Sequence, residues 1–424
     1  MDTERSGRDG GLLPVILGGD IGVYGIGRSF HEAFGVRSIC VASSPTVAIE
    51  RSDLFTVEHL PAHAGDAETL AVLDGLAAAH PGRELVLMAN HDVHSAFVAR
   101  HRERLAGRYA LPFPDLGTID RVTDKAHFAR VCEDLGVPTP RTVVVDLAGA
   151  GKAGWRAPEV AFDFPVVAKA ARGDAYDAVD FPGKRKIWFL ESADDLAGLW
   201  RALAEAGFRD TFLVQELIPG DNTQMRSITA YVDSAGETTV IGSARVLLED
   251  HAPTMIGNPV AMITEAFPDL WEDARRILSS TGYRGFANFD VKIDPRDGRA
   301  VFFEVNPRIG RNNWYMTAAG ANPMPPMVAD LVDRDHGAPA GGAASSPRRE
   351  ILYSLVPDRL LLRYLRDEAL RERVRGLMRD GRRLDPLEYG AETDPRRRAV
   401  VALQKTNQYR KFRRYYPRAT DRSF

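Results

Sequence analysis

Cysteine is scarce in this sequence: Cys40 and Cys132 are the only two among 424 residues, and they lie far apart. Two distant cysteines provide neither a disulfide framework nor a metal-binding spacing, so we expect a reducing compartment, the cytoplasm. Residues 1–11 are polar and lack an apolar signal core, and no apolar run approaches the length that spans a bilayer. We therefore expect a protein that is neither exported nor embedded in a membrane, with no transmembrane segment.

Several common catalytic motifs are also missing. The sequence has no Gly-x-x-x-x-Gly-Lys-Ser/Thr loop, no protein-kinase catalytic loop and no serine or cysteine nucleophile elbow. Gly22, Gly25 and Gly27 follow the first predicted strand, but their spacing is the reverse of a dinucleotide fingerprint, and Ala42-Ser43-Ser44 replaces the acidic residue expected after the second strand. A nicotinamide cofactor is therefore excluded. The glycines predict either a tight turn or a small-anion site at a helix N-terminus.

Length and composition indicate a globular protein with two or three domains. Hydrophobic residues make up 44% of the chain and charged residues 27%, as in ordinary soluble proteins. The formal net charge of -3 hides an asymmetry, since residues 345–424 contain 21 Lys and Arg against 11 Asp and Glu, and the rest contains 34 against 47. A basic tail on an acidic body can mark an anionic partner.

Short apolar runs alternate with helical segments from Pro14 onward. Strands are expected at residues 15–17, 38–41 and 84–88, and helices at 28–34, 67–79 and 93–105. This alternation predicts an α/β fold, beginning with a doubly wound parallel-sheet domain. We expect that domain to span residues 14–115, after a disordered stretch at 1–13.

The remaining chain predicts an α+β region at residues 116–334, an Ala/Gly/Ser-rich linker at 335–347 and a basic C-terminal region at 348–424. A helix is expected over residues 123–135, with Thr123 as its N-cap. Further strands are expected at residues 164–169, 212–218, 227–231 and 239–247.

Residues 283–308 are the most informative segment, because they predict a β-hairpin. A turn at Asp294–Gly298, which contains Pro and Gly, separates two runs rich in aromatic and β-branched residues. Pairing centred on Asp297 places Asp290 opposite Glu304. Because side chains alternate across a strand, one face would carry Asn288, Asp290, Glu304 and Asn306, and the other Phe289, Val291, Phe303 and Val305.

The polar face of this hairpin has the composition of a metal site. Two carboxylates directly opposite one another repel unless a positive group lies between them. Carboxylate and amide oxygens are ligands that Mg²⁺ accepts, usually together with phosphates and water. Arg308 adds a fixed cation that suits a phosphoryl oxygen or an anionic intermediate. The alternative is a hairpin whose polar face simply meets water.

The order of these features resembles the ATP-grasp superfamily, specifically its carboxylate–amine ligases. The resemblance rests on the following succession: Lys125, Lys169 at the end of an apolar strand, the strand at residues 214–218, Asp221, Arg245, Asp290, Glu304, Asn306 and Arg308. The segment from Phe303 to Gly320 is similar to the branch that includes D-aspartate ligases acting on peptidoglycan precursors. Two features depart from the family pattern: Ala170 stands where proline often follows the lysine, and Gly173 and Gly183 lie far apart where a compact glycine-rich loop is usual.

The resemblance implies an ATP-grasp domain pair that binds ATP and two Mg²⁺ ions. It assigns the phosphates to Lys125, Lys169 and Lys184, the adenine edge to Gln215, Glu216 and Leu217, and the ribose to Asp221. It assigns the metal to Asp290, Glu304 and Asn306. Catalytic neutralisation of charge would fall to Arg308, Arg245 and Lys169, and docking of the acid or amine to Arg311, Asn312 and Asn313.

The implied reaction has two steps. A carboxylate attacks the γ-phosphate of ATP to give an acyl phosphate and ADP, and an amine then displaces phosphate to form an amide. Phosphoryl transfer of this kind depends mainly on positioning and charge neutralisation. The alternative is a non-catalytic ATP-binding sensor on the same fold. Amino acids, peptides and cell-wall precursors remain open as substrates, and so does a homodimer.

The basic C-terminal region predicts amphipathic helices. Residues 359–378 combine apolar and basic positions, and Tyr409, Phe412, Tyr415 and Tyr416 recur at helix-like spacing. We expect these helices to pack their apolar side against the main body. Binding of an anionic group by the tail is the alternative, whether on a diphosphate-bearing substrate, a membrane surface or a nucleic acid.

Overall fold

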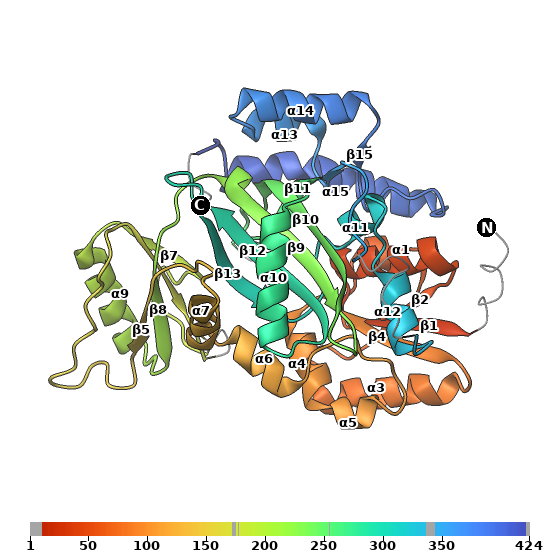
Figure 1. Cartoon of the computed structure of the whole chain (residues 1–424), viewed down its shortest axis with the longest axis horizontal. Helices are drawn as coiled ribbons and strands as arrows, with labels where there is room; N and C mark the ends of the chain where they lie inside the picture. Colours follow the sequence, from red (N-terminus) through yellow and green to blue (C-terminus); the bar gives the residue numbers. More distant parts are fainter. Residues whose placement is uncertain (1–10, 172–174, 177, 254, 336–343, 421–424) are drawn as a thin grey trace.

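The computed structural model describes residues 11–171, 175–176, 178–253, 255–335 and 344–420. Three sheets organise this part of the chain, in the strand orders β3-β2-β1-β4, β13-β12-β9-β10-β11-β14-β15 and β5-β8-β6-β7. The seven-stranded sheet lies at the centre of Figure 1, with the small sheet on the left, the N-terminal sheet on the right and the C-terminal helices across the top. The predicted α/β fold class is confirmed.

The N-terminal sheet is wholly parallel. Its strands are β1 (Leu12–Leu17), β2 (Ser38–Ala42), β3 (Phe55–His59) and β4 (Glu84–Ala89). The intervening helices are α1 (Ile21–Phe34), α2 (Val47–Glu50), α3 (Asp66–Ala79), α4 (Asp92–Arg100) and α5 (Arg102–Leu105). Residues 1–10 of the predicted disordered start lie outside the described residues, and β1 begins before the predicted boundary at 13. The chain order reverses between β1 and β4, and ligands of such sheets bind at this switch point.

The glycines after β1 have a role that the sequence did not predict. Gly22, Gly25 and Gly27 lie inside α1, so the predicted glycine turn is wrong. Asp20 caps this helix by accepting from the backbone nitrogens of Gly22 and Val23. A Cβ at Gly22 would lie 2.1 Å from Asn90 Nδ2, and one at Gly27 would lie 2.2 Å from the Phe55 ring. The glycines therefore permit close packing of α1.

The central sheet has a core on each face. It comprises β9 (Met225–Val232), β10 (Thr238–Glu249), β11 (Pro259–Thr264), β12 (Gly285–Ile293), β13 (Ala300–Asn306), β14 (Leu352–Ser354) and β15 (Arg383–Leu384). Ile228, Phe289 and Val291 pack on one face with residues of α7 (Lys125–Asp134) and α10 (Pro268–Ser280). On the other face, one hydrophobic cluster joins this sheet to α1, to the N-terminal sheet and to the two short helices α11 (Trp314–Ala318) and α12 (Met324–Leu331).

Two helices stand where one was predicted at residues 123–135. Thr123 is the last residue of α6 (Leu116–Thr123), so its prediction as an N-cap is wrong. Asp124 caps α7 instead, and its carboxylate accepts from the backbone nitrogen of His127 at 2.7 Å. The break places Lys125 in the first turn of α7.

The small sheet is antiparallel and has its own core. Its strands are β5 (Thr142–Asp146), β6 (Val166–Ala170), β7 (Trp188–Leu190) and β8 (Thr211–Glu216), and α9 (Ala193–Glu205) packs against them. The short helix η2 (Asn222–Gln224) follows β8 and leads into β9 of the central sheet.

The C-terminal region packs on the central sheet, as predicted. It contains α13 (Asp358–Tyr364), α14 (Glu368–Arg379) and α15 (Pro395–Tyr415). Their apolar residues, among them Phe412, and Tyr416 directly after α15 share a core with β10, β11 and β14. Tyr409 and Tyr415 of the predicted aromatic set are exposed instead. Residues 336–343 of the predicted linker lie outside the described residues, whereas Ser345 bridges to Val240 of β10 and so belongs to the folded structure.

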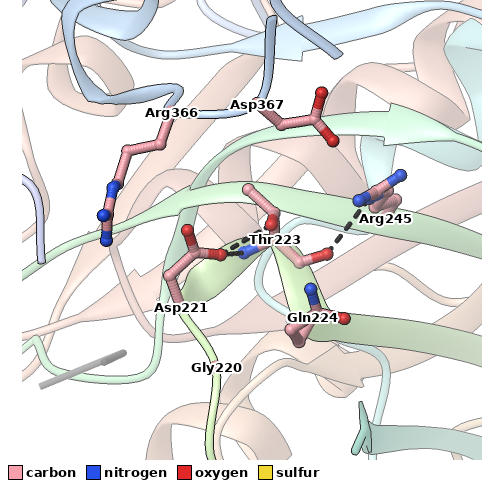
Figure 2. A pocket seen from close by; sticks show the side chains of 7 residues that line it. All are labelled: Gly220, Asp221, Thr223, Gln224, Arg245, Arg366 and Asp367. Atoms are coloured by element: carbon pink, nitrogen blue, oxygen red, sulfur yellow. Dashed lines mark hydrogen bonds between the residues drawn. The ribbon is translucent and has the colours of Figure 1, made fainter. Parts of the chain in front are cut away.

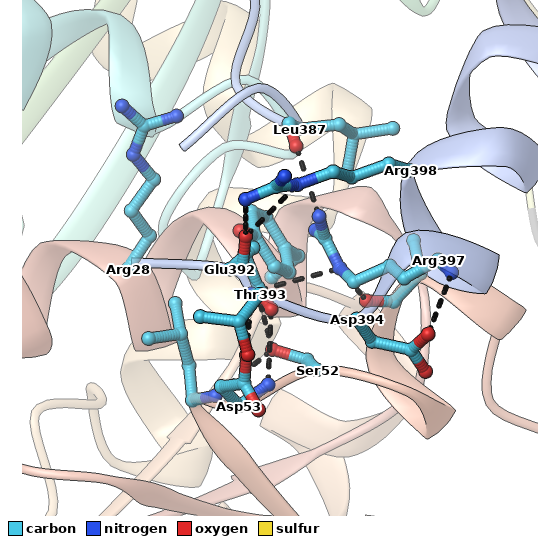
Figure 3. Close-up of polar contacts among 12 residues, drawn as sticks. Arg28, Ser52, Asp53, Leu387, Glu392, Thr393, Asp394, Arg397 and Arg398 are labelled. Atoms are coloured by element: carbon cyan, nitrogen blue, oxygen red, sulfur yellow. Dashed lines mark hydrogen bonds and ion pairs between the residues drawn. The ribbon is translucent and has the colours of Figure 1, made fainter. Parts of the chain in front are cut away.

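A buried polar network also joins the C-terminal region to the N-terminal domain (Figure 3). The carboxylate of Glu392 accepts from the hydroxyls of Tyr24 and Ser52, at 2.8 and 2.6 Å. It lies 3.4 Å from the guanidinium of Arg397, and both side chains are 1% exposed. Arg28 donates to the backbone carbonyls of residues 385, 386 and 388. The N-terminal domain and the C-terminal region are therefore joined.

Among the helices of the described residues, none has the length and apolar character of a membrane span.

Candidate active site

The hairpin of β12 and β13 has the predicted register. Asp290 pairs with Glu304, and Asn288 pairs with Asn306. The polar face of the hairpin, Asn288, Asp290, Glu304 and Asn306, is called the carboxylate cluster below. A bulge between Asp290 and Val291 shifts the pairing, so that Phe302, not the predicted Phe303, joins the apolar core. The bulge leaves Phe303 unpaired and half-buried.

The carboxylate cluster is held by hydrogen bonds from three elements. Asn306 Nδ2 donates to Asp290 Oδ2 at 3.0 Å. Asn288 Oδ1 accepts from the Ser227 and Thr229 hydroxyls of β9. Lys125, in the first turn of α7, forms an ion pair with Glu304. The loop between α6 and α7 thus brings a cation to one carboxylate only.

This asymmetry separates the two carboxyl groups chemically. Burial raises the pKa of Asp290, and the negative charge of Glu304 raises it further. The Lys125 ammonium lowers the pKa of Glu304 despite burial, and Lys169 contributes in the same direction. Glu304 is therefore the anionic member, whereas Asp290 forms no direct ion pair with another described residue, and the charges of Arg308 and Lys125 only partly offset the rise of its pKa.

Lys169 approaches this cluster from the small sheet. Its pKa is lowered to about 8, mainly by burial and also by the positive charge of Lys125, while Glu304 opposes the shift. The positive charge of the exposed Lys186 also lowers the pKa of Lys169. The predicted Lys184 instead donates to the Val179 carbonyl and lies over the Tyr176 ring. The phosphate role predicted for Lys184 is therefore not supported.

Of the two predicted adenine-edge residues within β8, Gln215 lies on the face of Lys169 and Glu216 does not. Val167 pairs with Gln215 and Lys169 with Leu213, so Gln215 and Lys169 project from the same face of the small sheet. Gln215 Nε2 donates to the Thr142 hydroxyl at 2.9 Å. Glu216 projects from the other face, where its carboxylate accepts from Arg141. Glu216 could therefore contact a nucleotide only through its backbone. Leu217 follows β8 and is half-buried.

Asp221 and Arg245 lie together in a larger pocket, which we call the turn pocket (Figure 2). Its volume is about 440 Å³, and its lining is Gly220, Asp221, Thr223, Gln224, Arg245, Arg366 and Asp367. Asp221 accepts from the backbone nitrogen and the hydroxyl of Thr223, and Arg245 Nε donates to the Thr223 carbonyl.

Arg245 is on the wrong face of the central sheet for its predicted role. Arg245 pairs with Arg226, which pairs with Val291, whereas Asp290 pairs with Ser227 and thence with Ala244. Directly paired residues share a face, so Arg245 and Asp290 project from opposite faces. The predicted contact of Arg245 with an acyl phosphate at the carboxylate cluster is therefore wrong.

A second, smaller pocket adjoins the carboxylate cluster. We call it the arginine pocket; its volume is about 50 Å³, and Asp290, Arg308, Arg311 and Asn312 line it together with Gly257, Asn258 and Pro259. Arg308 lies 3.2 Å from Asp92, and Arg311 lies 2.8 Å from Asp20. Arg308 and Arg311 thus line the same pocket as Asp290, and each is paired with a carboxylate of the N-terminal region.

Asn313 also borders the arginine pocket, but its side chain is a structural anchor. Its Nδ2 donates to the carbonyls of Gly22 and Gly310, at 3.0 and 2.9 Å. Its Oδ1 lies 2.9 Å from the position that a Cβ on Gly25 would occupy. The residue is 1% exposed. The predicted substrate contact of the Asn313 side chain is therefore not supported; it seats Arg311 and Asn312 against α1.

The N-terminal sheet supplies residues that sequence reasoning missed. Asp20 follows β1, and Asn90 and Asp92 follow β4, at the switch point of the parallel sheet. Asn90 Nδ2 donates to Asp20 Oδ1 at 2.9 Å, and Asp20 holds Arg311. Burial raises the pKa of Asp20, but Arg311 and these hydrogen bonds outweigh it and keep that pKa below its usual range. The strand order could have suggested these positions.

The donor set of the carboxylate cluster fits Mg²⁺ better than a softer metal. No group of three His, Cys, Asp or Glu side chains gathers within the described residues. The cluster offers two carboxylates and amide oxygens, which are hard ligands that bind Mg²⁺ when phosphates and water complete the shell. Asp290 is buried beside a second carboxylate, a placement that a cation would relieve. Asn306 now donates to Asp290, so its oxygen could bind the metal only after its amide turns.

Comparison with known proteins gives one relative along nearly the whole chain. D-aspartate ligase from Enterococcus faecium is 28% identical over 408 residues, which cover 96% of this chain and 97% of that protein. No protein-family model matches the chain.

Solved structures share the fold at low sequence identity. Biotin carboxylase from Campylobacter jejuni, a β,γ-ATP complex by its description, superposes with a TM-score of 0.56 at 17% identity, covering 80% of this chain and 74% of that one. L-amino acid ligase from Bacillus licheniformis superposes with a TM-score of 0.53 at 15% identity, covering 76% and 74%. The chain is therefore similar in sequence to D-aspartate ligase along nearly its whole length, and it shares its fold with biotin carboxylase and L-amino acid ligase.

Proposed function

We propose that this chain joins a carboxylate to an amine at the expense of ATP, through an acyl phosphate and with release of ADP and phosphate. One observation carries the proposal: two lysines and two carboxylates, from four separate elements, converge beside a pocket that contains two arginines. The length-spanning similarity to D-aspartate ligase supports it. A sensor that only binds ATP has no use for the arginine pocket.

Lys125 and Lys169 would bind the phosphates of the nucleotide. A cation about 4 Å from a phosphate oxygen contributes roughly 4 kcal/mol at an effective dielectric near 20. Lys125 is paired with Glu304 in the structure and would turn from the carboxylate to the phosphates. Gln215, on the face of Lys169, lies where the base would meet β8, and Asp221 would lie near the ribose.

Asp290 and Glu304, with the Asn306 oxygen turned toward them, would hold magnesium. The bound metal, two ions in our proposal, supplies charge neutralisation for the attack of a carboxylate on the γ-phosphate. Glu304 is already ionised, because Lys125 lowers its pKa. Asp290 must lose its proton to bind a metal, so affinity for the metal falls as the pH falls through the raised pKa of Asp290.

The arginine pocket would receive the carboxylate substrate. Arg308 follows the cluster closely in sequence, and its positive charge lowers the pKa of both Asp290 and Glu304. It would stabilise the acyl phosphate and the oxyanion that follows. Arg311, fixed by Asp20, would orient a carboxylate by charge-assisted hydrogen bonds, and Asn312 would line the approach. We propose an amino acid as the carboxylate substrate, in keeping with the named relatives.

Release of ADP and phosphate tests this proposal. The chain is incubated with MgATP and a matrix of amino acids and amines, and turnover is compared with that of Glu304→Gln. We expect ADP release that requires both an acid and an amine. Transfer of ¹⁸O from labelled carboxylate to phosphate identifies the acyl phosphate. No ADP release with any pair would refute the ligase function, and release without ¹⁸O transfer would refute the acyl phosphate.

A further inference from the structure

The connection between β10 and β11 forms one edge of the arginine pocket. Of this connection, residues 250–253 and 255–258 are described. Gly257 and Asn258, with Pro259 at the start of β11, line the pocket beside Asp290 and Arg308. The position of this edge sets the space that is left for a substrate.

The edge is tied to the beginning of the connection. The backbone nitrogen of Asp250 donates to the carbonyl of Asn258 at 2.9 Å, which closes the connection at its neck. The Asp250 carboxylate accepts from the backbone nitrogen of Ala252 at 3.0 Å. Any displacement of Asp250 is therefore transmitted to Asn258 and its neighbours.

Helix α15 and the residue after it contact the beginning of this connection, at Asp250 and His251. Lys411 of α15 forms an ion pair with Asp250, whose side chain is only 5% exposed. The Tyr416 ring, directly after α15, stacks on His251 with 3.6 Å between ring centroids and 5° between planes. Tyr364 of α13 donates to the Tyr416 carbonyl and fixes that ring in turn.

His251 also connects the beginning of the β10–β11 connection to the turn after β8. Its Nε2 donates to Asn222 Oδ1 at 3.3 Å, and Asn222 Nδ2 donates to the buried Glu249 carboxylate at 3.0 Å. Burial lowers the pKa of His251 to about 4, so the imidazole is neutral near pH 7 and can stack on an apolar ring face. One side chain thus links α15 with the residue beside Asp221.

We propose that Lys411 and Tyr416 of the C-terminal region are positioning residues for the substrate pocket: through Asp250 and His251 they fix the Gly257–Pro259 edge that the carboxylate substrate meets. The identity of that ligand rests on the proposed ligase function. The positioning role does not, because it follows from the contacts alone. Lys411 in this arrangement is committed to a buried carboxylate and is not available to an anionic partner.

Hydrogen exchange followed by mass spectrometry tests the positioning directly. Lys411→Met removes the ion pair but keeps an apolar stem, and Tyr416→Leu removes the stack. We expect exchange in peptides covering residues 250–259 to quicken about tenfold in both variants, while peptides of β1–β4 stay unchanged. Lys405→Met is the matched control, because Lys405 lies on the same helix but pairs with Asp385 and Glu388. Tyr416→Phe retains the ring and should behave as the natural chain.

Steady-state kinetics measure how the positioning affects substrate binding. In Lys411→Met and Tyr416→Leu, the KM for the carboxylate substrate should rise about tenfold, with the KM for ATP changed by less than about twofold. His251→Phe is a milder variant that keeps the stack and removes the bond to Asn222; it should leave exchange at residues 250–259 close to that of the natural chain.

Two results would overturn the proposal. Unchanged exchange at residues 250–259 in both Lys411→Met and Tyr416→Leu would show that α15 does not hold the edge. An equal rise in Lys405→Met would show only general loosening of the helix. Absence of ligase turnover in the natural chain would refute the proposed function, while the exchange measurement would still decide the positioning role.

Discussion

The turn pocket and the arginine pocket differ in size and in how their charges are used. The turn pocket is the larger, but Asp221 and Arg245 both bond to Thr223, and Asp367 caps α14. In the arginine pocket, the half-buried carboxylate of Asp290 meets two arginines that Asp92 and Asp20 of the N-terminal region hold in place. We therefore propose that catalysis takes place at the arginine pocket, where charges from several elements converge, and not in the larger cavity.

The largest difference between the pockets should appear on removing a carboxylate. Glu304→Gln should lower kcat by about 10³-fold, because it removes a charged metal ligand from the site of phosphoryl transfer. Asp367→Asn in the turn pocket should change kcat by less than about threefold. Steady-state ADP release measures both, and circular dichroism checks that each variant is folded. A Glu304→Gln enzyme within tenfold of the natural chain would contradict the metal assignment.

The second largest difference is expected between an arginine of each pocket, Arg311 and Arg245, in the KM for the carboxylate substrate. Arg311→Ala should raise the KM for the carboxylate substrate about 10²-fold, because it removes a charge-assisted contact and leaves Asp20 without its cation. Arg245→Ala should change that KM by less than about threefold, since Arg245 projects from the other face of the sheet. Initial rates over a range of carboxylate concentrations decide the matter, and similar effects in the two variants would remove the distinction between the pockets.

The close approach of α1 gives a third test. Gly22→Ala would place a Cβ 3.0 Å from the Arg311 backbone and 2.1 Å from Asn90 Nδ2, and should lower the free energy of unfolding by about 2 kcal/mol. Gly75→Ala in α3, where nothing lies within 4 Å of the new Cβ, should not destabilise the chain. Urea unfolding measures both. Equal stability of the two variants would mean that α1 does not need its glycines.

The smallest predicted effect concerns pH. Lys169 is charged below its pKa of about 8 and loses its charge above it. Because only the charged form attracts phosphates, kcat/KM for ATP should fall as the pH rises through 8, by up to about tenfold per unit. Lys169→Met should lower kcat/KM at pH 7 and abolish this dependence. A natural enzyme with a flat profile from pH 7 to 9 would contradict the lowered pKa.

Sequence patterns predicted the local part of the site well. The register of Asp290 against Glu304 follows from side-chain alternation and a short turn, which involve neighbouring residues only. The bulge at Phe303 was missed, because it depends on how the hairpin packs. Thr123 and Asp124 are adjacent residues of types that favour helix N-caps, and only the break between α6 and α7 shows that Asp124 is the cap.

Contacts between distant segments could not be predicted in this way. The face of Arg245 depends on the register of β10, β9 and β12 together, so a family resemblance in residue order did not reveal it. The sequence predicted a turn at the glycines of α1, because the residues that require their close packing, Asn90 and Asn313, lie far away in sequence. Asp20 was missed for the same reason, since its partner Arg311 is 291 positions later.

The buried pair of Glu392 and Arg397 sets an order on the assembly of the molecule. The hydroxyls of Tyr24 and Ser52 have their acceptor 368 and 340 positions later in the chain, so these contacts form only after residue 392 has been made. Until then the surface of α1 that receives this segment stays open to water. A fragment that stops at residue 347 would keep every strand of the first sheet and yet retain that open surface, so the tail cannot be trimmed away as an appendage.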